Sequence, residues 1–201
     1  MSELRTAEPR IRHYIDAAAA MVALPRFEYR GHEYTPGELL EGQILAESNG
    51  DPRARRYEAH QDRADRRDRA QDADTADQDD GDLEDDASYG LMQIMGYNAR
   101  ILLGVRPGTP MKFGFLFLAQ INISLGLRIL AGELAAVYRL HPHSTEQELL
   151  VRALARYNGG PTGDSWDNQR NDFRLRAYVD HVAENCLRAA ESRRLVGWTE
   201  V

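Results

Sequence analysis

The stretch TPGELLEGQILAESNG, residues 35–50, carries the strongest helix signals of the chain. Thr35 is suited to be a helix N-cap, Pro36 occupies the first helical position, and Glu38 stands three residues after the cap. This combination is typical of a capping box. Asn49-Gly50 is typical of a helix C-terminus. The stretch therefore predicts a helix that ends at this Asn-Gly pair.

Apolar residues recur at helical spacing over most of the remaining chain, with little strict alternation. A second capping box, Thr145 with Glu148, precedes a helix that should stop at Asn158-Gly159-Gly160-Pro161. Further helices are predicted over residues 8–22, 92–103, 121–140 and 171–193. We therefore expect an all-α fold in a single domain that spans residues 1–201.

Length and composition fit one compact domain, since 42% of the 201 residues are hydrophobic. Cys186 is the only cysteine, so no disulfide forms within the chain. No run approaches the ~20 apolar residues of a transmembrane helix. Glu3, Glu8 and Asp16 interrupt the N-terminal region where a signal peptide would need a long apolar core. We expect a monomer with no membrane span and no recognisable signal peptide.

The negative charge of the chain is concentrated in one segment. Residues 60–87 hold eleven Asp, one Glu and four Arg, a local net charge of −8, whereas the rest of the chain has a net charge of +1. Residues 61–86 contain Leu83 and otherwise only scattered Ala as apolar side chains, too little to offset the entropy of ordering. We expect a disordered acidic insertion at 61–86. The acidic excess also argues against nucleic acid as a partner, because phosphate binding requires clustered Lys or Arg.

Glu47 is the first candidate for chemistry. It lies three residues after Ile44 and eight after Leu39, on the apolar side of the predicted helix. Burial favours the protonated form of a carboxyl group, which a general acid near neutral pH requires. A glutamate at a helix end whose head reaches water is the alternative that the stretch alone leaves open.

Two further stretches stand out, SYGLMQIM at residues 88–95 and ARYNGG at residues 155–160. Gly90 permits close approach of the backbone, and the amide of Gln93 offers a donor and an acceptor that suit the acetamido group of a sugar. The hydroxyl of Tyr157 could reach a cleft just before the helix ends. Core packing and ordinary helix capping also account for most of these residues.

In this order, the three stretches resemble the catalytic domain of the soluble lytic transglycosylases, relatives of goose-type lysozyme that cleave bacterial peptidoglycan. Residues 122–130 and 176–179 extend the resemblance, which covers about residues 36–185. It implies a lysozyme-like helical domain with a saccharide-binding cleft. The chain departs from the family in two places: the acidic insertion lengthens the gap after Glu47, and Arg156 replaces an alanine common before the Tyr-Asn pair.

The resemblance makes Glu47 the single catalytic acid, with no metal and no cofactor. The substrate-binding residues that it implies are Ser48, Gln93, Met95, Tyr157 and Asn158, and the candidate auxiliary residues are Asp85, Asp86 and Tyr178.

The activity implied is cleavage of the MurNAc-GlcNAc β-1,4 bond of peptidoglycan strands with formation of 1,6-anhydroMurNAc ends. Two alternatives stay open. One is a hydrolase of goose-lysozyme type, in which Asp85 or Asp86 positions water. The other is a non-catalytic glycan-binding or structural module of a secretion or phage particle. We expect action on the cell wall, in the periplasm or outside the cell, after export, lysis or delivery in such a particle.

Overall fold

The computed structural model describes residues 9–22, 24–57, 87–106, 109, 111–160 and 169–197. Its elements in chain order are α1 (Pro9–Met21), β1 (Phe27–Tyr29), β2 (His32–Tyr34), α2 (Pro36–Ser48), β3 (Arg55–Tyr57), β4 (Ala87–Tyr89), β5 (Ile94–Met95), α4 (Gly96–Leu102), the 3-10 helix η1 (Phe113–Phe117), α5 (Ala119–Leu140), α6 (Glu146–Gly159) and α7 (Gln169–Gly197). The predicted acidic insertion at 61–86, which includes Asp85 and Asp86, lies outside the described residues.

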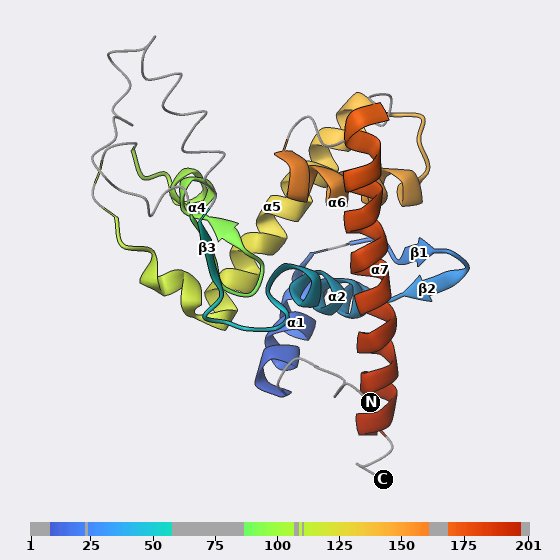
Figure 1. Ribbon diagram of the computed structural model, residues 1–201, viewed down its shortest axis with the longest axis horizontal. Helices are drawn as coiled ribbons and strands as arrows, with labels where there is room; N and C mark the ends of the chain where they lie inside the picture. Colours follow the sequence, from blue (N-terminus) through green and yellow to red (C-terminus); the bar gives the residue numbers. More distant parts are fainter. Residues whose placement is uncertain are drawn as a thin grey trace.

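The described part of the chain is mostly helical, as predicted. Figure 1 shows the long helix α7 crossing α2, with the β1–β2 hairpin on the other side of α7. Helix α1 packs on α2 and on α5, and α6 packs on both α5 and α7. β3, β4, β5, α4 and η1 lie apart from α7, at the opposite side of the molecule (Figure 1), and are called the smaller lobe below.

Two small antiparallel sheets correct the expectation of an all-α fold. The β1–β2 hairpin turns through Arg30 and Gly31, whose φ angles of 51° and 80° are both positive, as a tight two-residue hairpin turn requires. The second sheet has the order β3-β4-β5, with Ser88 opposite Met95. Strands of two or three residues are too short to show a period of two, so the sequence pattern could not reveal them.

The helix predicted over residues 92–103 begins later than expected. α4 spans only Gly96–Leu102, because the residues before it form the turn after β4 and strand β5. Gln93 in this turn has a φ of 45°, which lies in the left-handed region and cannot continue a right-handed helix.

Both predicted capping boxes are confirmed. The backbone N–H of Glu38 donates to Oγ1 of Thr35 at 3.3 Å, and the carboxylate of Glu38 accepts the N–H of Thr35 at 2.8 Å. Thr145 and Glu148 form the same pair of bonds at 3.2 and 2.9 Å. α2 ends before Asn49, whose φ of 56° is left-handed. The helix that carries Glu47 therefore begins and ends where its caps predict.

Helix α2 lies in the core of the described structure. Every residue from Leu39 to Leu45 is buried, including the polar Glu41 and Gln43. A segment that is buried on all sides has no solvent face, so the apolar residues of α2 are not confined to one side of the helix.

The closest approach between α2 and α7 occurs where Gly42 meets Cys186. A Cβ on Gly42 would contact the Sγ of Cys186 and would lie 2.7 Å from its backbone nitrogen. Cys186 is fully buried, and burial raises the pKa of its thiol well above the usual range. Cys186 thus acts here as a small apolar residue that lets the two helices touch.

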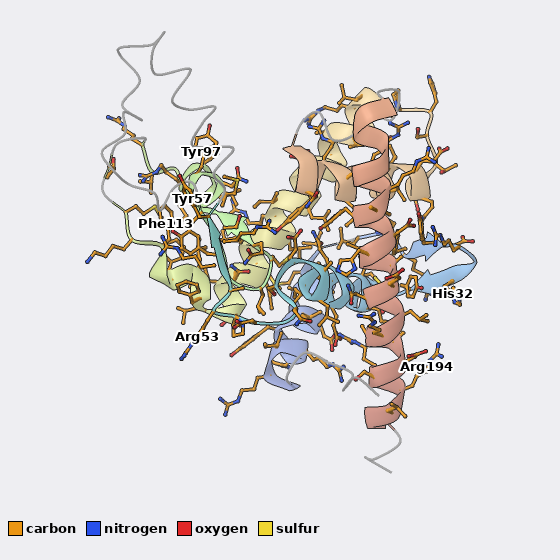
Figure 2. All side chains as sticks on the ribbon, in the orientation of Figure 1. His32, Arg53, Tyr57, Tyr97, Phe113 and Arg194 are labelled. Atoms are coloured by element: carbon orange, nitrogen blue, oxygen red, sulfur yellow. The ribbon has the colours of Figure 1, made fainter. Side chains whose placement is uncertain are left out.

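The smaller lobe is packed around aromatic rings. The ring of Tyr89 stacks on that of Phe113 with 5.6 Å between centroids, and it meets Phe117 edge-on at 5.7 Å. Figure 2 shows Phe113 on this lobe together with Tyr57 and Tyr97, which are partly exposed. These aromatic contacts fix the turn between β4 and β5 on the lobe.

Helix α5 is, within the described ranges, the one helix long and apolar enough to cross a membrane by length and composition, with a mean hydropathy of 1.3 over its best window. A core helix of a globular fold passes the same test. α5 packs against α1, α6 and η1, and its residues Ile123, Leu130 and Val137 are buried. Packing in this fold therefore accounts for part of its apolar character, since 39% of that window is buried.

We predict that Gly42→Ala destabilises the protein by roughly 1–3 kcal/mol, because the added methyl group meets the backbone of Cys186 and forces α2 and α7 apart. Gly132→Ala on the exposed side of α5 is the matched control, since a Cβ there meets nothing within 4 Å. It should stabilise the protein by about 0.5–1 kcal/mol. Urea unfolding of both variants measures the difference, and equal effects at the two positions would contradict the close helix crossing.

Candidate active site

Glu47 lies in the last turn of α2 and is half-buried. The hydroxyl of Tyr178, on α7, donates a hydrogen bond of 2.6 Å to its Oε1. Tyr178 precedes Cys186 by two helical turns, so the close crossing of α2 and α7 places the phenol against the end of α2. Two residues separated by 131 positions thus form one hydrogen-bonded pair.

Tyr157 is the second phenol of the site and lies near the end of α6. Burial raises the pKa of Tyr157 well above its usual range, and the charge of Glu47 raises it further. The hydroxyl of Tyr157 donates to the backbone oxygen of Met92 at 2.7 Å. The charge of Glu47 therefore acts on Tyr157, whose hydrogen bond to Met92 ties α6 to the smaller lobe.

Tyr178 experiences the same electrostatic environment. Burial is the largest cause that raises its pKa well above the usual range, followed by the charge of Glu47 and the hydrogen bond to it. The neighbouring Tyr157 raises it as well. Both phenols therefore stay protonated at neutral pH, so they act at this site as hydrogen-bond donors.

Gln93 is held by its own turn. Its amide nitrogen donates to the backbone oxygen of Gly90 at 2.9 Å and to that of Ala54 at 3.4 Å, and the residue is buried. These bonds join the β4–β5 turn to the loop that follows α2. A contact between Gln93 and a sugar, which the sequence predicts, would have to use its remaining acceptor.

The other predicted site residues have more varied positions. Ser48, the last residue of α2, is half-buried and donates to the backbone oxygen of Ile44 at 3.0 Å. Met95 is half-buried on β5, and Asn158 is exposed in the last turn of α6. Asp85 and Asp86 are outside the described residues, so their place relative to Glu47 stays a prediction.

Arg156, which stands where the resembled family commonly has alanine, is buried next to Tyr157. Its Nε donates to the carboxylate of Glu133 on α5 at 2.5 Å. This ion pair joins α6 to α5 immediately before Tyr157, so the departure from the family pattern has a structural counterpart in the helix packing.

Asn122 supports the site, a role that the sequence analysis did not predict, although the resemblance includes residue 122. It is fully buried at the start of α5, where its side-chain oxygen accepts the N–H of Met92 at 2.7 Å. Its amide nitrogen donates to the backbone oxygens of Tyr89 at 2.8 Å and Leu116 at 2.9 Å. The sequence feature that could have indicated this role is the position of a polar asparagine on the apolar face of a predicted helix, three residues before Leu125.

The Asn122 bonds require glycine at position 90. Gly90 has a φ of 72°, and a Cβ there would contact both the amide of Asn122 and the backbone oxygen of Leu116. Asn122 therefore fixes the strand–turn segment from Tyr89 to Met92, whose last backbone oxygen receives the bond from Tyr157.

Within the ranges that the structure describes, no group of three or more His, Cys, Asp or Glu side chains is placed to hold a metal ion. The arrangement instead consists of one carboxyl group with two phenols at the junction of α2, α6 and α7. Such a set can transfer one proton and orient a neutral polar ligand.

Comparisons of the chain with protein-family models, with curated proteins and with solved structures gave no match.

We predict that Asn122→Ala destabilises the protein by about 3 kcal/mol or more, because each buried backbone group left unpaired costs roughly 1–3 kcal/mol. Asn158→Ala is the control, since Asn158 is exposed on the neighbouring helix, and it should change the free energy of unfolding by less than about 0.5 kcal/mol. Thermal and urea unfolding measure both. Equal stability of the two variants would show that the turn is held by other contacts.

Proposed function

We propose that this protein is a peptidoglycan lytic transglycosylase with a lysozyme-like fold, and that Glu47 is its single acid and base. The hydrogen bond of 2.6 Å from Tyr178 to Glu47 is the observation that carries the proposal. This hydrogen bond joins Glu47 in the first stretch of the resemblance to Tyr178 in the last one. The bond supports the resemblance independently of the sequence motifs, because the two stretches are far apart in the chain. The charge of Glu47 also raises the pKa of Tyr157, which comes from the third motif.

The chemistry of the group fits cleavage of a glycosidic bond. A standard glycosidase uses two carboxyl groups, one as acid and the other as nucleophile or base. A glycan with a 2-acetamido group and a free C6 hydroxyl supplies the second function itself. One carboxyl group then suffices, provided that it is held in a fixed orientation, and Tyr178 supplies that orientation for Glu47.

The reaction proceeds in two proton transfers. Protonated Glu47 donates its proton to the glycosidic oxygen, the C1–O bond of MurNAc breaks, and the strand beyond leaves with a free C4 hydroxyl on GlcNAc. The acetamido group stabilises the positive charge that develops at C1. The C6 hydroxyl then bonds to C1 while the Glu47 carboxylate takes its proton, which gives a 1,6-anhydroMurNAc end and restores the acid. No water is consumed.

The saccharide cleft that this reaction needs would lie between the smaller lobe and the end of α2. The two regions meet there through the Tyr157–Met92 bond and the bond of Gln93 to Ala54. In this arrangement Gln93, Met95 and Asn158 would contact the sugars, and Ser48 would support the end of α2. The enzyme would reach the wall by export, by release on lysis or in a particle.

We predict that Glu47→Gln lowers the rate of lysis of purified sacculi by about 100- to 10,000-fold, the usual contribution of a general acid and base. The glutamine is isosteric and its oxygen still accepts from Tyr178, so the unfolding temperature should stay close to that of the parent. Glu184→Gln, an exposed site on α7, is the matched control and should keep full activity. Retained lysis by Glu47→Gln would end the proposal.

The products separate the proposed activity from its alternatives. If Glu47 acts alone, the C6 hydroxyl, held at high effective concentration, captures C1 before water does. Mass spectrometry of the released muropeptides should then show anhydro ends, which are lighter by one water than reducing ends. Predominantly reducing ends, lost in Asp85→Asn or Asp86→Asn, would identify a goose-type hydrolase. Binding to sacculi without any soluble product would identify a non-catalytic glycan-binding module.

A further inference from the structure

The side chains that would contact the sugars are uncharged, apart from the acid Glu47. Gln93, Met95 and Asn158 offer two amides and a thioether. MurNAc, however, differs from GlcNAc by a lactyl ether that ends in a carboxyl group. This group is either free or joined to a peptide that carries carboxylates of its own. Recognition of such a carboxylate calls for a cationic side chain on the same surface, and arginine is the residue best suited to it.

The sheet of the smaller lobe places an arginine on the same face as Met95. Arg56 on β3 is paired with Ser88 on β4, and Ser88 is paired with Met95 on β5. Residues directly opposite one another in a sheet point to the same side, so these three side chains form a row across one face. Arg56 and Met95 are two strand spacings apart, roughly 10 Å, which a disaccharide unit can span.

The opposite face of the sheet is used for packing. Its row consists of Arg55, Tyr89 and Ile94. Tyr89 and Ile94 are buried, and the ring of Tyr89 stacks on that of Phe113. The guanidinium carbon of Arg55 lies 5.4 Å from the centroid of the Tyr89 ring. Two consecutive arginines of β3 therefore point to opposite faces, the first toward the aromatic core of the lobe and the second toward the face with Met95.

Arg56 is also close to Gln93 along the strand. The amide nitrogen of Gln93 donates to the backbone oxygen of Ala54 at 3.4 Å. Ala54 precedes Arg56 by two residues, a distance of about 7 Å along an extended chain. The side chain of Arg56 is exposed. An exposed guanidinium group thus shares one small sheet with two predicted sugar contacts.

Two other arginines near the site are less suited to this role. Arg156, next to Tyr157, is buried and paired with the carboxylate of Glu133. Arg176 precedes Tyr178 by two positions on α7, and residues two apart on a helix do not share a face.

We propose that Arg56 is a specificity-determining residue, whose guanidinium group binds a carboxylate of the glycan and so makes the protein prefer MurNAc-containing strands to neutral polymers of GlcNAc. The planar fork of N–H donors on arginine matches the two oxygens of a carboxylate. The inference rests on the proposed function, because it takes Gln93 and Met95 as sugar contacts.

Isothermal titration calorimetry in the Glu47→Gln background, which leaves glycans intact, tests this preference. The ligands are a peptide-free GlcNAc-MurNAc tetrasaccharide, the same glycan with its peptides, and chitotetraose, which has no carboxylate. Arg56→Gln should weaken binding of carboxylate-bearing glycan about 10- to 100-fold, the usual contribution of a hydrogen bond to a charged group, and leave chitotetraose unchanged. Loss with the peptide-free ligand identifies the lactyl carboxylate as the group bound, whereas loss with the peptide-bearing ligand alone identifies the peptide.

Arg55→Gln is the matched control, because it removes the same charge from the same strand on the opposite face. It should keep the parental affinities. Both arginines are exposed, so the unfolding temperatures should stay close to that of the parent. An equal loss of affinity in Arg55→Gln and Arg56→Gln would indicate a general effect of charge and overturn the inference. Parental affinities for all three ligands in both Arg56→Gln and Arg56→Ala would overturn it as well.

Binding and cleavage separate failure of this inference from failure of the proposed function. A carboxylate preference that depends on Arg56, in a protein that releases no product from sacculi, would keep the inference and end the proposed function. Normal lysis of sacculi with no such preference would overturn the inference alone. Absence of binding to all three ligands would overturn both.

Discussion

The close crossing of α2 and α7 is the constraint on which the rest of the structure depends. Gly42 allows the backbone of α2 to lie directly on α7 at Cys186. Because the helices touch there, the end of α2 meets Tyr178, which then donates to Glu47. Any larger side chain at position 42 would increase the distance between the helices and with it the distance between these two groups.

Next to this crossing, ion pairs connect α2 to its neighbouring helices. Glu41 is fully buried, and its two carboxylate oxygens accept from Arg12 on α1 at 2.9 Å and from Arg193 on α7 at 2.8 Å. Arg193 also pairs with Asp16 on α1 at 2.8 Å. A buried ion pair adds little to stability compared with apolar packing. The Glu41 carboxylate nevertheless joins α1, α2 and α7 at one point, because its two guanidinium partners come from α1 and α7.

How much of this the sequence could reveal depends on how local each signal is. The capping boxes at Thr35 and Thr145 involve four consecutive residues each, and both predictions were correct. The helix predicted from residue 92 was wrong at its start, because the turn is set by Asn122, thirty residues away.

The candidate site follows the same rule. Glu47, Tyr157 and Tyr178 were named through the resemblance, and the structure joins Tyr178 to Glu47 by a hydrogen bond. The most direct measurement of the central claim is a crystal structure of Glu47→Gln with a bound MurNAc-containing oligosaccharide. We expect a glycosidic oxygen at about 2.6–3.2 Å from the side chain of residue 47, with Tyr178 still bonded to it. A glycan bound away from the end of α2 would contradict the account.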